Sequence, residues 1–317
     1  MISIVIPLWN KAPYVQRCLD SVLAQTYDNF EVIVVDDGST DDGPEQVTAI
    51  PDRRIRLVRQ PNGGVAVARN RGMAESRGEW IAFLDADDEW TPDHLATLSD
   101  LMGRYPQCGM VSASYWLHRD DTGNQWQPCF DGLPFHGPHG VITNYYEVAA
   151  NGNNPINMNT FAVRRDLIER CGGFPIGIES GEDTYFEARC LADTDLAYSL
   201  HPTSVYHLFE EGKNYRAFRS HNPVDDLYDG LLRLGQGKTG IRRFVATWHK
   251  QRMTHAVHCG HPATALRQFT RAIRIYPWDK KTYYQALMAL LAIVTRRDVY
   301  ELMQAFRPQK QAKQKKQ

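Results

Sequence analysis

Residues 80–88 read WIAFLDADD, an apolar run that ends in three carboxylates within four positions. A short apolar run of this kind is typical of a buried strand. One of the acids could cap a following helix, but capping does not account for all three. Uncompensated negative charge behind a buried strand is costly, and a bound cation would offset it. Asp85 and Asp87 are therefore candidate ligands for Mg²⁺ or Mn²⁺, which prefer oxygen donors.

Segments with strand and helix patterns alternate along the first hundred residues. The expected elements are strand 2–6, helix 15–23, strand 31–35, strand 55–58, helix 65–76 and strand 80–84. Strands that alternate with helices predict parallel βαβ units in an open α/β sheet. Ligands of such sheets bind beyond the carboxyl ends of the strands. Asp36 and Asp37 follow one of these strands, so we expect both acidic clusters to border one cleft.

The composition excludes several classes of protein. The chain has 317 residues, long enough for two domains or for one large domain with an appendage. Thirty-six Lys and Arg against 37 Asp and Glu argue against nucleic acid as the main partner. The longest apolar run, residues 286–294, is about half of the roughly 20 residues that a membrane-spanning helix needs. The first ten residues lack the basic run of a signal peptide, so we expect a cytoplasmic protein.

The pattern changes near residue 215. Residues 1–215 have the α/β pattern, whereas residues 216–306 have helical patterns only. Small residues within 256–277 fall at the spacing of one tetratricopeptide-like hairpin. One such unit cannot form a solenoid, which favours a helical appendage over a partner-binding array. Residues 307–317 are basic and polar, and we expect them to form a disordered tail.

Six short segments, in this order, resemble glycosyltransferase family 2. They are IVIPLWN at 4–10, VVDDGSTD at 34–41, NGG at 62–64, ARNRG at 68–72, FLDADD at 83–88 and GED at 181–183. The resemblance extends over about residues 1–210. It implies a GT-A-like, nucleotide-sugar-binding α/β domain with a mostly parallel central sheet over residues 1–215, followed by the α-helical region.

The resemblance also implies where a nucleotide sugar would bind. Pro7, Asn10, Asp36 and Asp37 would hold the base and ribose, and Arg69 would lie near the phosphates in the same pocket. In the DXD motif, Asp85 would contact the ribose or the metal, and Asp87 would be the principal metal ligand. His207 could complete the metal site, although a lone histidine is more often packed or exposed.

The implied reaction is the inverting transfer of a sugar from a nucleoside-diphosphate sugar, with UDP favoured, to a glycan or lipid-linked saccharide. Asp183 would be the catalytic base, with Glu182 beside it shaping the acceptor site. A metal would stabilise the departing diphosphate, and one base with one displacement inverts the anomeric carbon. The family implies a hexosyl- or N-acetylhexosaminyltransferase of polysaccharide or lipopolysaccharide biosynthesis.

Alternatives remain for several of these residues. Asp36 and Asp37 also suit a turn, and Glu182 and Asp183 suit the first turn of a helix. A sugar nucleotidyltransferase is a second candidate, but it would need a glycine-rich loop where this chain has IPLWNKAPY. A non-catalytic scaffold with a decayed site is a third, against which the intact acids argue.

The last helical segment permits a peripheral membrane contact. Leu287, Leu290, Leu291 and Val294 share one face, and basic residues follow. A helix of this kind with a Lys-rich tail could rest on the inner face of an anionic bilayer. Packing of the same face on the rest of the chain is the alternative.

Overall fold

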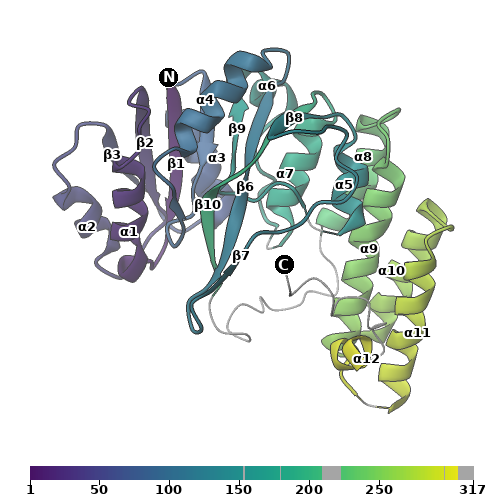
Figure 1. Ribbon diagram of the computed structural model, residues 1–317. Coiled ribbons are helices and arrows are strands. Elements are labelled where there is room, and N and C mark those ends of the chain that lie inside the picture. The colour runs from purple at the N-terminus through teal and green to yellow at the C-terminus, as the bar shows by residue number, and fades with distance from the viewer. Residues whose placement is uncertain (153, 179, 209–222, 296, 306–317) are drawn as a thin grey trace. The chain divides into compact units, whose positions relative to one another are not determined.

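The computed structural model describes residues 1–152, 154–178, 180–208, 223–295 and 297–305 (Figure 1). The chain separates into two compact units. The first comprises Met1–Arg216 and Gly230–Ile241, and the second comprises Ala217–Asp229 and Arg242–Gln317. The predicted domain boundaries stay predictions, and the predicted disordered tail lies outside the described residues.

Within the described residues of the first unit, ten strands form one sheet in the order β3-β2-β1-β4-β9-β6-β10-β5, with β7 on β6 and β8 on β10. The strands are β1 (Ile2–Leu8), β2 (Phe30–Asp36), β3 (Ile55–Arg59), β4 (Trp80–Phe83), β5 (Glu89–Trp90), β6 (Met110–Arg119), β7 (Asn124–Trp126), β8 (His139–Ile142), β9 (Phe161–Arg164) and β10 (Leu196–Leu208). The helices of the same region are α1 (Ala12–Leu23), α2 (Gly43–Ala49), α3 (Val65–Glu75), α4 (His94–Arg104), α5 (Tyr145–Asn151), α6 (Arg165–Cys171) and α7 (Glu182–Leu191).

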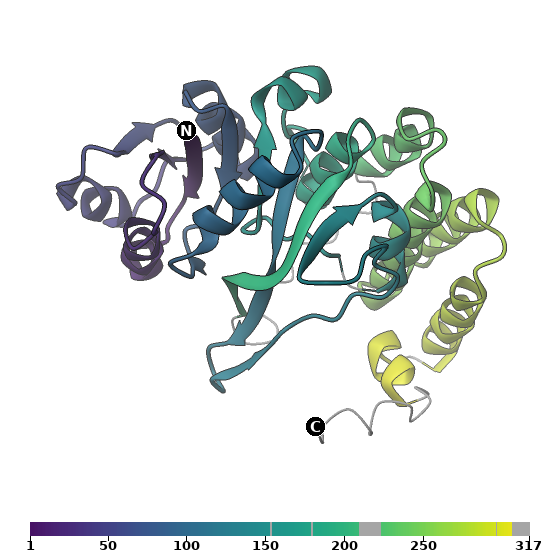
Figure 2. The same cartoon turned by 45° about the horizontal axis from the view of Figure 1, so that its top comes forward.

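The predicted α/β class with a central sheet is confirmed. Strands β3, β2, β1 and β4 pair in parallel, as expected for βαβ units. Beyond β4 the sheet is mixed, because β9 runs antiparallel to both β4 and β6 while β10 runs parallel to β6. Figure 2 shows β6 and β10 as long neighbours in this half of the sheet.

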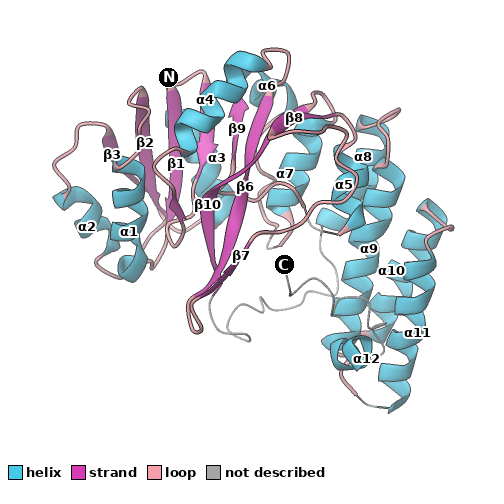
Figure 3. Cartoon of the chain, in the orientation of Figure 1, coloured by secondary structure: helices cyan, strands magenta, loops and turns pink. Residues whose placement is uncertain are grey.

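Helices cover both faces of the sheet, as Figure 3 shows. On one face, alternate β1 residues such as Ile4 and Ile6 pack in one core with α1 and α4. On the other face α3 lies very close to β1: a Cβ on Gly72 would come within 2.3 Å of Cγ1 of Val5. Phe83, the register partner of Val5 on β4, stacks edge-on against Phe186 of α7. Helices α3 and α7 therefore cover the same face.

The parallel strands bring three loops to one edge of the sheet. β1, β2 and β4 end at Leu8, Asp36 and Phe83, so the loops 9–11, 37–42 and 84–88 begin side by side. The amide of Asp37 donates to the carbonyl of Leu8 at 2.8 Å, which joins two of these loops directly. Asn10, Asp37, Asp85 and Asp87 lie in these loops because of this topology.

The region after residue 103 is more regular than its sequence indicates. Frequent Gly, Pro, His and Asn predict loops at 103–155, but the structure contains β6, β7, β8 and α5 there. The sequence predicts a strand at 204–208, and these residues form the last part of β10, a 13-residue strand with register shifts around Pro202. Serine in β6 and proline in β10 weaken the strand patterns, and pairing of the two strands compensates.

The second unit is helical. α8 (Val224–Leu234) begins in it, and α9 (Ile241–His258), α10 (Pro262–Ile275), α11 (Lys280–Thr295) and α12 (Val299–Ala305) follow. Met253 and Ala256 of α9 pack on Ala265 of α10, and Gly260 makes the turn with a φ of 76°. Small residues thus lie at this contact between two helices, and the tetratricopeptide-like character of the hairpin stays a prediction. Among the described residues, no helix has the length and apolar character needed to cross a bilayer.

Candidate active site

The loop that follows β4 is held in place by Asn159. This side chain is fully buried, and its Oδ1 accepts the Asp85 amide at 2.7 Å while its Nδ2 donates to Asp88 Oδ2 at 2.5 Å. The Trp90 indole donates to the Asn159 carbonyl at 2.6 Å. One buried amide thus fixes both ends of the acidic loop.

The three acids of this loop do not have the same surroundings. Asp88 is buried and accepts the backbone N–H of His207 at 2.7 Å. Burial, and then the charges of Asp87 and Asp85, raise the pKa of Asp88 well above its ordinary value. Asp85 and Asp87 keep partly exposed side chains. Asp88 therefore anchors the loop, and the other two are available to a ligand.

Asp87 faces the loop that follows β1. Its carboxylate makes an ion pair with Lys11, and its carbonyl accepts Nη2 of Arg17 at 2.5 Å. The ammonium of Lys11 supplies the positive charge beside this carboxylate that a bound metal ion would otherwise supply. The side chain of Lys11 is 36% exposed, so it can withdraw into water. Two partly exposed carboxylates at a position that already attracts a cation fit Mg²⁺ or Mn²⁺.

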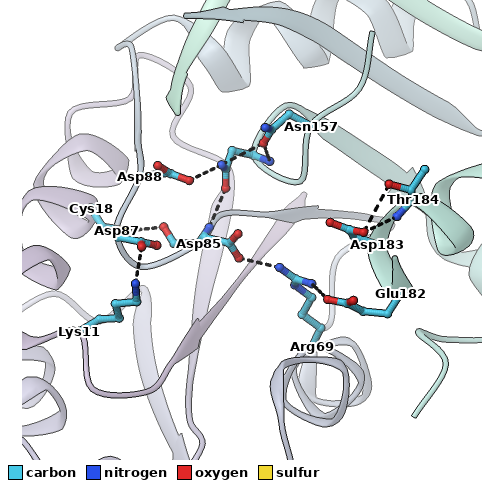
Figure 4. Close-up of polar contacts among 11 residues, drawn as sticks. Lys11, Cys18, Arg69, Asp85, Asp87, Asp88, Asn157, Glu182, Asp183 and Thr184 are labelled. Carbon is cyan, nitrogen blue, oxygen red and sulfur yellow. Dashed lines mark hydrogen bonds and ion pairs between the residues drawn. The ribbon is translucent and has the colours of Figure 1, made fainter. Parts of the chain in front are cut away.

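Arg69 connects the acidic loop to α7. Its Nη2 contacts Asp85 Oδ1 at 2.7 Å, and its Nη1 lies 3.7 Å from Glu182 Oε1. The side chains of Arg69 and Glu182 are each 4% exposed. Burial opposes the positive charge, but the surrounding carboxylates outweigh it and raise the pKa of Arg69. The charged guanidinium therefore lies between the two acidic segments, as Figure 4 shows.

Asp183 lies in the first turn of α7, beside Glu182. Gly181, in the left-handed conformation with a φ of 87°, precedes the helix. Oδ1 of Asp183 accepts the Thr184 amide at 2.7 Å. Unlike Glu182, Asp183 is only half-buried. A carboxylate that a ligand can reach is suited to accept a proton.

Comparison with known proteins gives the family. The sequence model of Glycosyl transferase family 2 matches residues 3–172. The chain belongs to glycosyltransferase family 2. The uncharacterized glycosyltransferase YibD of Escherichia coli (strain K12) is 36% identical to it over 275 residues, which cover 81% of this chain and 79% of YibD. Several other bacterial glycosyltransferases match over shorter stretches, so the chain covers only 18–42% of their length.

Solved structures share the fold of this family 2 chain. Residues 1–349 of S. aureus TarS, crystallised with UDP-GlcNAc, superpose with a TM-score of 0.70 at 18% identity, covering 96% of this chain and 91% of that one. The mannosyltransferase PcManGT from Pyrobaculum calidifontis, in complex with GDP-Man and Mn²⁺, gives a TM-score of 0.58 at 22% identity and covers 96% and 84%. The expected GT-A-type α/β fold is confirmed.

The second acidic cluster of this family 2 chain contains two different residues. Both oxygens of Asp37 are engaged: Oδ1 accepts Gln60 Nε2 at 2.7 Å and the Gly63 amide at 2.9 Å, and Oδ2 accepts the Gly64 amide at 2.8 Å. Among the described residues, the carboxylate of Asp36 accepts one hydrogen bond, from the Ser39 amide at 2.9 Å. Asp37 holds the following loop, and Asp36 has acceptor capacity left for a ligand.

Pro7 and Asn10 border the same edge. Pro7 lies in β1 opposite Val35, one residue before the strand ends. Asn10 has a φ of 52°, and its Oδ1 accepts the amide of Thr40 at 2.8 Å. The two loops that would receive the nucleotide are thus linked by a side chain whose own backbone takes an uncommon conformation.

His207 has a different environment from the one expected. Its Nδ1 lies 2.6 Å from Asp120 Oδ1 and its Nε2 lies 3.0 Å from Glu89 Oε1. Burial alone would lower the pKa of His207, but these hydrogen bonds outweigh it and raise the pKa. Among the described residues, the hydrogen bonds and ion pairs of this imidazole include neither Asp85 nor Asp87. Its role in the metal site stays a prediction.

Some site residues gave no recognisable signal in the sequence. Lys11 and Arg17 reach Asp87 from the first loop and from α1, but isolated basic residues occur throughout the chain. Asn159 lies in a region without a clear pattern, where the sequence alone is equally compatible with an acceptor contact and with a turn residue. Its burial against the acidic loop depends on the pairing of β9 with β4, which no local pattern specifies.

Proposed function

We propose that the chain is an inverting glycosyltransferase that moves a hexosyl or N-acetylhexosaminyl group from a UDP sugar to a hydroxyl group of a saccharide or lipid-linked acceptor. The observation that carries this proposal is the bridge made by Arg69 between Asp85 and Glu182. Through it, the acid pair suited to a divalent cation and the half-buried carboxylate of Asp183 belong to one site.

Asp183 is the proposed base. Its carboxylate is held by the amide of Thr184 at the start of α7, and its partial exposure leaves room for an acceptor hydroxyl. The base accepts the hydroxyl proton as the oxygen attacks the anomeric carbon from the face opposite the diphosphate. One displacement inverts the configuration. Glu182, buried beside it, positions Arg69 and shapes the acceptor side.

Asp87 and Asp85 would hold Mg²⁺ or Mn²⁺, with Lys11 moving off Asp87 in exchange. When bound, the cation would neutralise the charge of the departing diphosphate. PcManGT was solved with Mn²⁺, which supports a divalent metal here. Arg69 supplies a further positive charge, and it stays beside Asp85 whether or not the cation is bound.

The nucleotide would lie across the ends of β1 and β2. Trp9 is 55% exposed although it is large and apolar, and its ring is available to stack on a base. Pro7 and Asn10 flank it, and Asp36 offers an acceptor to the base or ribose. UDP is the favoured nucleotide because TarS was crystallised with UDP-GlcNAc and with UDP.

A peripheral membrane contact is part of the proposal. On α11, Leu287 is 52%, Leu290 58% and Val294 72% exposed. An apolar helix face of this kind can insert into the surface of a bilayer, where a lipid-linked acceptor would lie. The enzyme would then act on the cytoplasmic face of the membrane in polysaccharide or lipopolysaccharide synthesis. The double variant Leu287→Gln/Leu290→Gln should float less with phosphatidylglycerol vesicles than the wild type, whereas Leu266→Gln should float as the wild type does. Equal flotation of the wild type and both variants would refute the contact.

The substitution Asp183→Asn tests the reaction. The variant should bind UDP with unchanged affinity in the presence of Mn²⁺, while slow hydrolysis and transfer from UDP sugars fall at least about 100-fold, the usual contribution of a general base. The control is Glu45→Gln, which changes an exposed first-turn acid of α2 that pairs with exposed Arg59. An Asp183→Asn protein with wild-type turnover would refute the assignment of the base. If the wild-type chain showed no activity with any UDP sugar, the alternative of a non-catalytic scaffold protein would be favoured.

A further inference from the structure

The ends of β6 and β10 carry a cluster of metal-ligating side chains that includes neither Asp85 nor Asp87. His118 and His207 are register partners on these parallel strands, and their rings lie 5.2 Å apart on the same face. Asp120 follows the end of β6, and its backbone amide donates to the carbonyl of Leu208. One ligand atom from each of the three side chains lies within 4.8 Å of the other two.

A fourth side chain orients the cluster. Oε1 of Glu89, on β5, lies 3.0 Å from Nε2 of His207. This contact holds the imidazole so that Nδ1 faces Asp120 Oδ1, which is 2.6 Å away and also 3.5 Å from Nε2 of His118. A carboxylate on one nitrogen of a histidine, with the other nitrogen facing further ligands, is the usual outer environment of a metal-binding histidine.

We propose that His118, Asp120 and His207 bind Zn²⁺, with Glu89 orienting His207. Two imidazoles and one carboxylate suit Zn²⁺, whereas Mg²⁺ prefers oxygen donors alone. The site is separate from the Asp85 and Asp87 pair and does not depend on the proposed transfer reaction.

The geometry needs only a small adjustment to accept the ion. With metal–ligand bonds of about 2.0–2.1 Å in a tetrahedron, neighbouring ligand atoms lie about 3.3 Å apart. Asp120 must therefore withdraw by less than 1 Å from His207, and it is 30% exposed and can do so. His207 is 5% exposed and stays fixed, while His118 is 27% exposed. The partly exposed side leaves a fourth position for water.

The bound ion would affect the acidic loop indirectly. It clamps the end of β6 to the end of β10, and the amide of His207 donates to Asp88, the buried anchor of residues 84–88. His207 is thus a shared support of the zinc site and of the loop. The role of the ion is to stabilise this arrangement, so its removal should lower the melting temperature of the chain.

Zinc binding is tested directly on the full, untagged chain after treatment with EDTA. Competition between the protein and a chromophoric chelator for added Zn²⁺ should reveal one tight site per chain, and Zn²⁺ should raise the melting temperature. His118→Ala and Asp120→Asn, both at partly exposed positions, should weaken this site at least 10-fold and abolish the thermal shift. Glu89→Gln should weaken it about 10–100-fold, the range for an orienting partner.

Two control variants separate this site from others. His201→Ala removes the exposed histidine paired with Asp93 at 2.7 Å and should leave the affinity unchanged. Asp87→Asn should also leave it unchanged if the ion binds where we propose. Wild type and His118→Ala with equal zinc affinity would overturn the proposal, as would loss of the tight site in Asp87→Asn.

Discussion

Replacement of Arg69 by methionine should destabilise the first unit strongly. The guanidinium is almost completely buried between Asp85 and Glu182, and Glu182 is equally buried. Breaking a buried ion pair by removing one partner typically costs about 3–5 kcal/mol, because the other charge keeps its desolvation cost. Asp85 is 28% exposed and can be hydrated, so most of the cost comes from Glu182. We therefore expect a loss of about 3 kcal/mol, a large part of the roughly 5–15 kcal/mol that stabilises a domain.

A second substitution checks this reasoning. Adding Glu182→Gln to Arg69→Met removes the charge that the first substitution left behind. The double variant should be more stable than Arg69→Met alone by about 1–3 kcal/mol, the usual range for coupled neighbours. Arg69→Lys should be intermediate, because one ammonium cannot contact both carboxylates as a guanidinium does.

Urea unfolding at pH 7, followed by tryptophan fluorescence and by hydrogen exchange of peptides from α3 and α7, measures these differences. The control is Glu182→Gln alone, which completes the cycle of variants. Two results would refute the reasoning: an Arg69→Met protein within about 1 kcal/mol of wild type, or a double variant whose loss equals the sum of the single losses.

Three further predictions concern the packing and charge of the first unit. Gly72→Ala should cost about 1–3 kcal/mol in urea unfolding because its Cβ overlaps β1, whereas Gly103→Ala, in open space on α4, should stabilise by about 0.5–1 kcal/mol. Asn159→Ala should cost about 1–3 kcal/mol and reduce transfer, because Asp88 and the loop amide lose their buried partner; unchanged transfer would contradict a positioning role. Burial, and then the charge of Asp183, raise the pKa of Glu187, so the folded state binds its proton more tightly than the unfolded state. The stability that this tighter proton binding provides is complete below the ordinary pKa of a glutamate and is lost as the pH rises. The melting temperature of Glu187→Gln relative to that of wild type should therefore increase between pH 4 and pH 8.

The first half of the fold follows from local patterns. The runs at Ile2–Leu8 and Phe30–Asp36 are buried on both faces, so their composition alone identifies parallel strands, and the helix between them, α1, has a clear apolar stripe. The acids at the strand ends then follow from topology. The second half depends on contacts between distant segments: β10 continues through Pro202 because β6 pairs along its length, which no short window reveals.

The candidate site is likewise predictable in part from local patterns, while the rest depends on contacts between distant segments. Residue types and order predict Asp85 and Asp87, which follow a buried strand, whereas the role of Asp183 is predicted from the resemblance to the family. Their different surroundings are not predictable, since the burial of Asp88 and the exposure of Asp87 depend on Asn159, more than 70 residues away along the chain. The environment of His207 depends likewise on Glu89 and Asp120, from two other segments.

The adjacent residues Asp36 and Asp37 show how an activity screen of this enzyme would mislead. Asp37 accepts three hydrogen bonds from residues 60–64, so its replacement should disturb that segment and lower turnover in addition to any loss of the predicted nucleotide contact. A scan scored by product formation alone would therefore not separate the loss of loop structure from the loss of nucleotide binding. Measuring melting temperature and nucleotide affinity for every inactive clone would distinguish the two.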